Sequence, residues 1–225
     1  FAKILAHAPY TLNACAEKEY IREFAYNTML DDLKRMEFVP GNLYNFHPGS
    51  HVGQGIEKGI EMISNLLNSI MWKEQTTTVL LETMSGKGSE VGSKFEELRE
   101  IIDRVELDDK MGVCLDTGHL NYSAFPDQTA FIKKAGKRLI ALHIADNEGK
   151  TDQHMMPFGR GKIDFETVVR ALRAVDYQGS ESYRTGKYYR ALQEVTLTGD
   201  PRTDIVNIAL SQVGYQESAY IKELS

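Results

Sequence analysis

The sequence predicts a single α/β barrel, in which parallel strands alternate with helices, and three observations support this fold class. A chain of 225 residues is long enough for one large domain of this kind. Apolar runs of about five residues are separated by longer amphipathic segments, which is typical of strands buried on both faces. Several runs end on a carboxylate or an imidazole, and barrels of this class keep their chemistry at the carboxyl ends of their strands.

The first predicted strand covers residues 3–6 and ends at His7. Apolar side chains then recur at roughly helical spacing, which predicts an amphipathic helix over residues 17–37. Proline and glycine at 40–41 end that helix. The second strand, residues 42–46, therefore follows a complete strand and helix unit.

The next two helices and the strand between them repeat this order. The second strand runs into His47, and branched apolar residues at helical spacing predict a helix over 56–70. The third strand, residues 76–81, delivers Glu82 to its carboxyl end. The sequence Ser93-x-x-Glu96 then predicts a capping box that opens the third helix.

The fourth strand, residues 111–115, delivers Asp116. We expect a loop through Asn121 and Pro126 after it, and a helix over 127–136.

The fifth strand, residues 138–142, delivers His143. The long polar segment 146–162 is predicted to be a functional loop, because loops of that length are rarely simple connectors. Asp164 is the expected N-cap of the helix that carries apolar residues over 165–172.

The regular pattern weakens near the end of the chain. Residues 180–183 form at best a poor strand, and residues 205–210 are an apolar patch on a predicted helix. Five clear units and one doubtful unit fall short of the eight in a closed barrel. We therefore expect a metal-binding barrel domain over 1–179, incomplete at its N-terminal units, with 180–225 as an irregular extension packed on it.

Composition restricts the classes of function. With 26 Lys and Arg against 32 Asp and Glu, the net charge is −6, which excludes a generic phosphate-coating protein but not a local metal-rich pocket for an anionic backbone. Cys15 and Cys114 show no CxxC spacing, which favours the reducing cytoplasm. No apolar stretch approaches the ~20 residues of a membrane span, so we expect no membrane partner. The start at Phe1 indicates a fragment, a processed chain or an engineered one.

Histidines gather at the predicted strand ends. Five of the six lie at these ends or in the segments just after them: His7, His47, His119, His143 and His154. Glu82, Asp116 and Asp152 occupy similar places. Imidazoles and carboxylates that converge from separate strands are ligands for zinc, or for manganese and iron where oxygen ligands dominate.

Four stretches resemble endonuclease IV, the family of zinc-dependent abasic-site endonucleases. They are ILAHAPY at 4–10, NFHPGSHVGQG at 45–55, LETMSGKG at 81–88 and GVCLDT at 112–117. The resemblance covers residues 1–117 and implies an eight-stranded barrel with up to three Zn²⁺ ions, acting as a DNA-repair hydrolase on DNA that contains abasic sites. That family begins with two further strand and helix units, which this sequence lacks.

The resemblance implies a role for each candidate ligand. His7 and His47 resemble the imidazoles of the first zinc, and Glu82 resembles the catalytic carboxylate that bridges the first and second ions. Asp116 and His143 resemble further ligands of the second zinc.

The third zinc and the DNA contact are implied in the same way. His119, Asp152 and His154 resemble the ligands of the third ion. One more glutamate is expected late in the barrel, and Glu181 is the best match in a stretch that no longer resembles the family. Tyr10 resembles a residue of a DNA-contacting loop.

Residues 111–179 also resemble a second family of the same fold, the sugar phosphate isomerases and epimerases of the xylose-isomerase-like superfamily. The stretches are DTGHLN at 116–121, HIADNEGKTDQH at 143–154 and GRGKID at 159–164. This resemblance implies a single Mn²⁺ or Mg²⁺ and a small sugar or sugar phosphate as substrate. A chimera of related pieces would carry both signatures.

Three functions remain open from the sequence: a zinc phosphodiesterase, an isomerase, and a metal-binding barrel scaffold without activity. His7 and His47 favour the phosphodiesterase, because an isomerase does not need an imidazole pair at those two strand ends. The sequence gives no prediction of oligomeric state.

Overall fold

The computed structural model describes residues 3–123, 126–155 and 161–177, and within them five parallel strands form one sheet. The strands lie in chain order, so each is hydrogen-bonded to the next one in the sequence. They are β1 (Leu5–His7), β2 (Leu43–Phe46), β3 (Thr78–Glu82), β4 (Met111–Asp116) and β5 (Leu139–His143). The five strands predicted from the apolar runs are all present.

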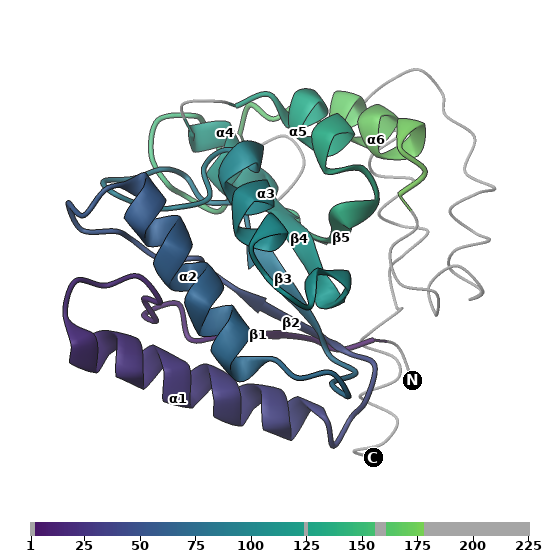
Figure 1. The fold of residues 1–225 in the computed structure, drawn as a ribbon. Helices are drawn as coiled ribbons and strands as arrows, with labels where there is room; N and C mark the ends of the chain where they lie inside the picture. The colour runs from purple at the N-terminus through teal and green to yellow at the C-terminus, as the bar shows by residue number, and fades with distance from the viewer. Residues whose placement is uncertain (1–2, 124–125, 156–160, 178–225) are drawn as a thin grey trace, which may run out of the picture.

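Helices follow the strands and cover one face of the sheet (Figure 1). The helices are α1 (Glu19–Met36), α2 (Ile56–Ile70), α3 (Phe95–Asp103), α4 (Thr117–Tyr122), α5 (Gln128–Ala135) and α6 (Phe165–Ala174). Two short 3₁₀ turns, η1 (Asp108–Lys110) and η2 (Gly136–Arg138), lead into β4 and β5. None of the helices in these ranges is both long and apolar enough to cross a membrane.

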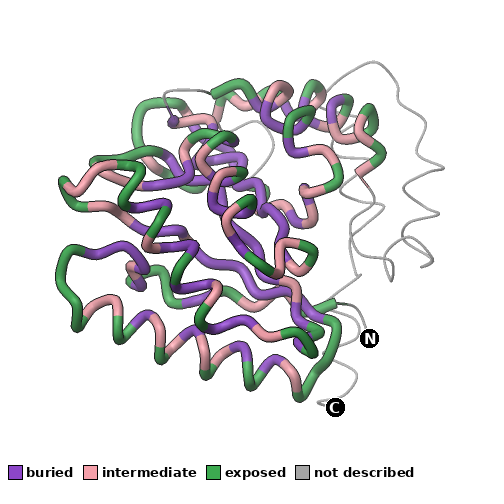
Figure 2. Tube along the Cα trace, viewed as in Figure 1, coloured by how far each residue is buried: buried purple, intermediate pink, exposed green. Residues whose placement is uncertain are grey.

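The three middle strands, β2 to β4, are buried along almost their whole length, as the apolar runs predict, and the outer strands β1 and β5 are less so (Figure 2). Alternate residues of a strand point to opposite faces. Val79 and Leu81 of β3 pack in the large core against the helices, whereas Leu80 packs in a smaller cluster on the other face. Cys114 and Ala141 join Leu80 there. We call the face that carries this smaller cluster, and with it Glu82 and Asp116, the inner face of the sheet.

Strand register gathers the polar residues at one edge of the inner face. Glu82 is paired with Cys114 across β3 and β4, and Asp116 is paired with His143 across β4 and β5. Since the strands are parallel, their carboxyl ends lie at the same edge of the sheet. The residues predicted to carry the chemistry are therefore brought together by the topology itself.

The predicted capping box at the start of α3 is wrong. Lys94 is the N-cap residue, and no side chain caps the helix. Glu97, one position later than predicted, turns back and accepts a hydrogen bond of 2.8 Å from the backbone nitrogen of Gly92. Glu96 instead pairs with Lys134 of α5, because that ammonium group lies within reach of the first turn.

The segment after β4 is a helix and not the expected loop. Asp116 is the N-cap of α4, and its Oδ1 accepts a hydrogen bond of 2.8 Å from the backbone nitrogen of His119. The cap places His119 in the first turn of α4, pointing back over the end of β4. The short helix therefore positions one of the candidate ligands.

The expected N-cap of α6 is confirmed. The Asp164 side chain accepts a hydrogen bond of 3.1 Å from the backbone nitrogen of Thr167. Residues 178–225 lie outside the described residues, and with them the doubtful strand at 180–183, the predicted helix at 205–210 and Glu181.

Candidate metal centre

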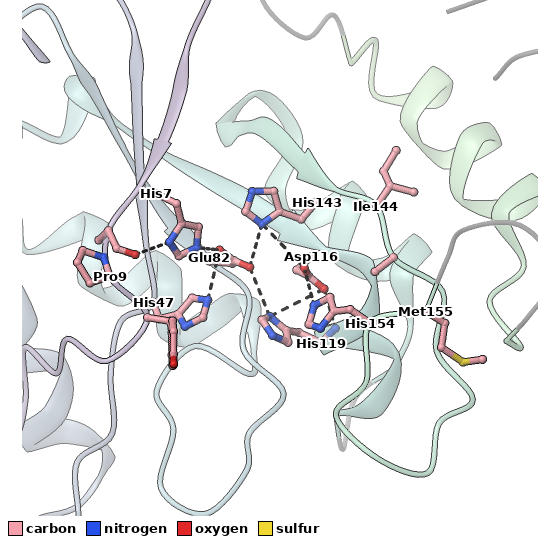
Figure 3. Close-up of a pocket in the computed structure, with 13 residues that line it drawn as sticks. His7, Pro9, His47, Glu82, Asp116, His119, His143, Ile144, His154 and Met155 are labelled. Atoms are coloured by element: carbon pink, nitrogen blue, oxygen red, sulfur yellow. Dashed lines mark hydrogen bonds and ion pairs between the residues drawn. The ribbon is translucent and has the colours of Figure 1, made fainter. Parts of the chain in front are cut away.

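Glu82 lies at the centre of the candidate site and is almost fully buried, with 1% of its surface exposed (Figure 3). Its Oε2 is 2.9 Å from His7 Nε2 and 3.6 Å from His47 Nε2. These imidazoles come from the ends of β1 and β2. One carboxylate oxygen therefore faces the pair of histidines that the sequence singled out.

The other carboxylate oxygen of Glu82 faces two further imidazoles. Oε1 is 3.0 Å from His143 Nδ1 and 3.5 Å from His119 Nδ1. His119 Nδ1 also lies 2.9 Å from the backbone oxygen of Thr83. Four imidazoles thus converge on a single buried carboxylate.

Asp116 links this group to His154. Its Oδ2 is 3.0 Å from His154 Nε2 and 3.9 Å from His143 Nδ1. Oδ1 caps α4 and lies 3.9 Å from His119 Nδ1, so Oδ2 is the oxygen that faces His143 and His154. Asp116 is 2% exposed, so it is a second buried carboxylate beside Glu82.

Three sets of donor atoms in the described residues are close enough to hold a metal ion. They are His7, His47 and Glu82; Glu82, Cys114 and His143; and Asp116, His119 and His154. In each set the ligand atoms lie within 4.8 Å of one another. Imidazole and carboxylate are the donors that zinc, manganese and iron take in proteins.

Asp152 lies at the edge of the third set and supplies a further observation. Its Oδ1 is 3.9 Å from His119 Nε2, and it is buried with no hydrogen-bond partner in the described residues. Its Oδ2 is 3.4 Å from Ser85 Oγ. A buried carboxylate oxygen without a partner is costly, and a cation would satisfy it. The donor chemistry and this oxygen both fit a metal ion.

Hydrogen bonds across the site control its charge. Burial raises the pKa of Glu82, but hydrogen bonds from His143, His47 and His7 outweigh it and hold the pKa well below its usual range. The hydrogen bond to Glu82 raises the pKa of His7, and the bond to Asp116 raises that of His154. The buried carboxylates therefore make His7 and His154 easier to protonate when no metal is bound.

The site opens into a cavity of about 670 Å³. Its walls include the ligand candidates of all five strands and the segment from Ala8 to Tyr10. Ile144 and Met155 lie on the opposite side (Figure 3). Tyr10 is 79% exposed, so its ring stands at the rim and faces solvent.

The structure brings eight of the nine predicted ligands to one place, and Glu181 lies outside the described residues. Seven of the eight belong to the three sets, and Asp152 adjoins the third. Reasoning from the sequence did not single out Asn45 and Cys114, which also contact or adjoin Glu82. The strand period of two could have identified them. Asn45 lies two residues before His47, and Cys114 lies two residues before Asp116, so both are expected on the same face as those ligands.

With this fold and site in place, the class of protein can be stated. The chain belongs to the xylose isomerase-like TIM barrel family, whose model matches residues 2–194.

Within that family, the chain is similar to proteins named probable endonuclease 4. It is 57% identical to the one from Clostridium botulinum and 49% identical to the one from Alkaliphilus oremlandii, each over 183 residues. Both matches cover 76% of this chain, and they cover 66% and 65% of the relatives, slightly less than two thirds of their length. The likeness therefore extends well past residue 117, where the motifs alone predicted its end.

Solved structures of two kinds share the fold. Endonuclease IV from Thermus thermophilus matches with a TM-score of 0.61 and 27% identity, covering 76% of this chain and 64% of that one. A D-tagatose 3-epimerase-like protein matches with a TM-score of 0.70 and 25% identity, covering 79% and 68%. Both resemblances predicted from the sequence thus have counterparts among known structures.

Proposed function

We propose that this chain carries the metal centre of a zinc-dependent phosphodiesterase that cleaves DNA at abasic sites. The observation that carries the proposal is the placement of His7 and His47 on the same oxygen of Glu82. An isomerase with a single metal does not need this pair of imidazoles. The relatives named probable endonuclease 4 support the same class of reaction.

We assign the ligands to up to three zinc ions. His7, His47 and Glu82 would hold the first ion, and Glu82, Asp116 and His143 the second. The third set combines His119 and His154 with a carboxylate. For that carboxylate the family resemblance favours Asp152, whose Oδ1 is unpartnered, while Asp116 is nearer to His154 in the described residues. Glu181 remains the predicted ninth ligand.

Zinc bound here would supply a Lewis acid for the phosphate and a water with a pKa lowered toward neutrality. The chain's own residues determine where this chemistry takes place. Glu82 is ionised and nearly inaccessible to solvent, so it presents two oxygens to ions on either side. In the proposed site Glu82 would be a ligand of both the first and the second ion, and the imidazoles around it would supply the remaining ligands.

A DNA backbone at this site would be held by the metal centre and by the rim of the cavity. The net charge of the chain is −6, so attraction for a polyanion must come from the metal centre itself. Tyr10, exposed at the rim, offers an aromatic face to a base or deoxyribose next to the cleaved phosphate.

The test is a comparison of wild type with Glu82→Gln. We expect wild-type protein to bind two to three zinc ions per chain, by elemental analysis, and to nick a duplex that contains an abasic-site analogue. Glu82→Gln removes the charge that two ions share, so zinc content should fall and nicking should drop by at least ~100-fold.

Glu37→Gln is the matched control. Glu37 is a carboxylate that accepts hydrogen bonds at the other end of the same strand, far from the cavity. This variant should keep its zinc and its nicking activity. A wild type with one metal and no nicking would contradict the proposal, and so would a Glu82→Gln variant with full zinc content.

The alternative is a metal-dependent sugar or sugar phosphate isomerase, favoured by the match to the D-tagatose 3-epimerase-like structure. It predicts one Mn²⁺ or Mg²⁺ per chain and the interconversion of a keto sugar or its phosphate. Bound metal with neither activity would indicate the third function, a metal-binding scaffold.

A further inference from the structure

Asn45 lies directly beneath the candidate metal centre. It is the third residue of β2, paired with Leu80 of β3, and it is 0% exposed. The strand period puts its side chain on the inner face together with His47, two residues later. A neutral amide is therefore buried within contact of the most buried carboxylate of the site.

The amide of Asn45 has a defined orientation. Its Nδ2 donates a short hydrogen bond to Glu82 Oε2, the oxygen that also faces His7 and His47. An ionised carboxylate only accepts hydrogen bonds, so the nitrogen and not the oxygen of the amide must face it.

This orientation leaves the amide oxygen buried without a partner. Asn45 Oδ1 has no hydrogen-bond partner in the described part of the chain. A buried acceptor without a donor destabilises the fold. An apolar side chain at position 45, like that of the neighbouring Leu80, would avoid this cost. Asn45 therefore supplies a hydrogen-bond donor to Glu82 at the cost of one buried, unsatisfied acceptor.

We propose that Asn45 is a positioning residue that fixes the Glu82 carboxylate in the orientation needed to bridge two metal ions. The inference rests on the proposed metal centre. Each imidazole nitrogen that binds an ion must first lose its proton, and it then no longer donates to Glu82. An amide keeps its hydrogens. Asn45 is therefore a donor to Glu82 that does not have to give up a proton to a metal ion, unlike an imidazole nitrogen that binds one.

The test compares zinc and cobalt binding by wild type and Asn45→Leu. Leucine is branched at the same carbon as asparagine and has as many side-chain heavy atoms, but it is larger and offers no donor. We expect the zinc dissociation constant, measured by competition with a chromophoric chelator, to rise about 10- to 100-fold. The visible absorption of bound Co²⁺ should also change, because it reports the geometry of the ligands. Asn45→Ala adds no bulk and repeats the measurement if the leucine variant does not fold.

Asn42→Ala is the matched control at the start of the same strand. Asn42 is also buried, and its Oδ1 accepts a hydrogen bond of 2.7 Å from the backbone nitrogen of Ile4, so the change removes structural bonds remote from the site. It should lower the melting temperature and leave the zinc affinity and cobalt spectrum of the folded protein unchanged. Wild-type affinity and spectrum in both Asn45 variants would overturn the role of Asn45 alone. A wild type that binds no zinc would overturn the metal centre as well.

Discussion

At the scale of single residues, the chemistry depends on a negative charge that is almost entirely removed from water. An isolated buried carboxylate would take up a proton to avoid this cost. Glu82 stays ionised because imidazoles from four different segments, and the amide of Asn45, point at its two oxygens. The imidazole nitrogens that stabilise the charge in the free protein are also the atoms that would bind metal, whereas the amide of Asn45 only donates a hydrogen bond.

Metal affinity should depend on pH for this reason. The pKa values of His7 and His154 are raised above their usual value of 6.5, by hydrogen bonds to Glu82 and Asp116. Zinc binds the neutral imidazole, so protons compete with it. As pH falls through the raised pKa values, zinc affinity should fall, and the loss should begin above pH 6.5.

The stability of the metal-free protein should depend on pH in the opposite direction. A histidine with a raised pKa stabilises the fold below its unfolded pKa, and this contribution is lost as pH rises through the folded pKa. The rise in melting temperature on adding zinc should therefore be larger at about pH 8 than at about pH 6. Melting curves with and without zinc at the two pH values check this. An equal rise at both would contradict the proposed role of these imidazoles.

At the scale of secondary-structure elements, both ends of β3 are held by side chains. At the carboxyl end, Glu82 contacts the imidazoles of the candidate metal centre. At the other end, the Glu37 carboxylate, just after α1, accepts hydrogen bonds of 3.0 Å from the backbone nitrogens of Thr76 and Thr77. It also accepts hydrogen bonds from both threonine hydroxyl groups. This contact links the end of α1 to the start of the central strand.

Glu37→Ala should weaken the fold without touching the site. The buried Thr77 would lose its acceptors, which costs about 1 to 3 kcal/mol of unfolding free energy. Urea denaturation checks the magnitude. Zinc content after refolding should match wild type, and a loss of zinc would show that the strand's position depends on both anchors.

The long loop after β5 is held by two buried polar residues. Asp146 forms an antiparallel bridge with Met155, and the Asn147 side chain donates to the backbone oxygens of Thr151 and Gln153. These bonds fix the segment that carries Asp152 and His154. Residues 146–155, the described part of the loop predicted at 146–162, are thus ordered beside the candidate ligands, and a function of the loop stays a prediction.

At the scale of the whole molecule, the metal ions should contribute to stability as well as to chemistry. The site joins β1, β2, β3, β4 and β5 at one edge, so a bound ion favours the folded sheet over the unfolded chain. At a free zinc concentration about 100 times the dissociation constant, linkage gives roughly 2.7 kcal/mol per ion.

Removal of metal tests this contribution. Dialysis against a chelator should lower the melting temperature, and added zinc should restore it in wild type but less so in Glu82→Gln. Equal melting temperatures with and without chelator in wild type would contradict a metal centre that joins the strands.

The sequence by itself predicted the strands, their order and most of the candidate ligands. This was possible because apolar runs buried on both faces, each ending on His, Glu or Asp, are local patterns that do not depend on distant contacts. The capping box at Ser93 failed because Lys134, far away in the sequence, lies next to Glu96 in the folded protein. The helix α4 was missed because Asp116 was interpreted only as a ligand, although its other oxygen caps a helix.

Only the tertiary structure decided which candidate donors lie close enough to share an ion and which residues contact them. The grouping of Asp116 with His154, the unpartnered oxygen of Asp152 and the amide of Asn45 under Glu82 all depend on strand register and loop path. Residue types reveal what an atom can bind. Which other atoms lie near that atom depends on distances between segments that are far apart along the chain. The local sequence does not contain these distances.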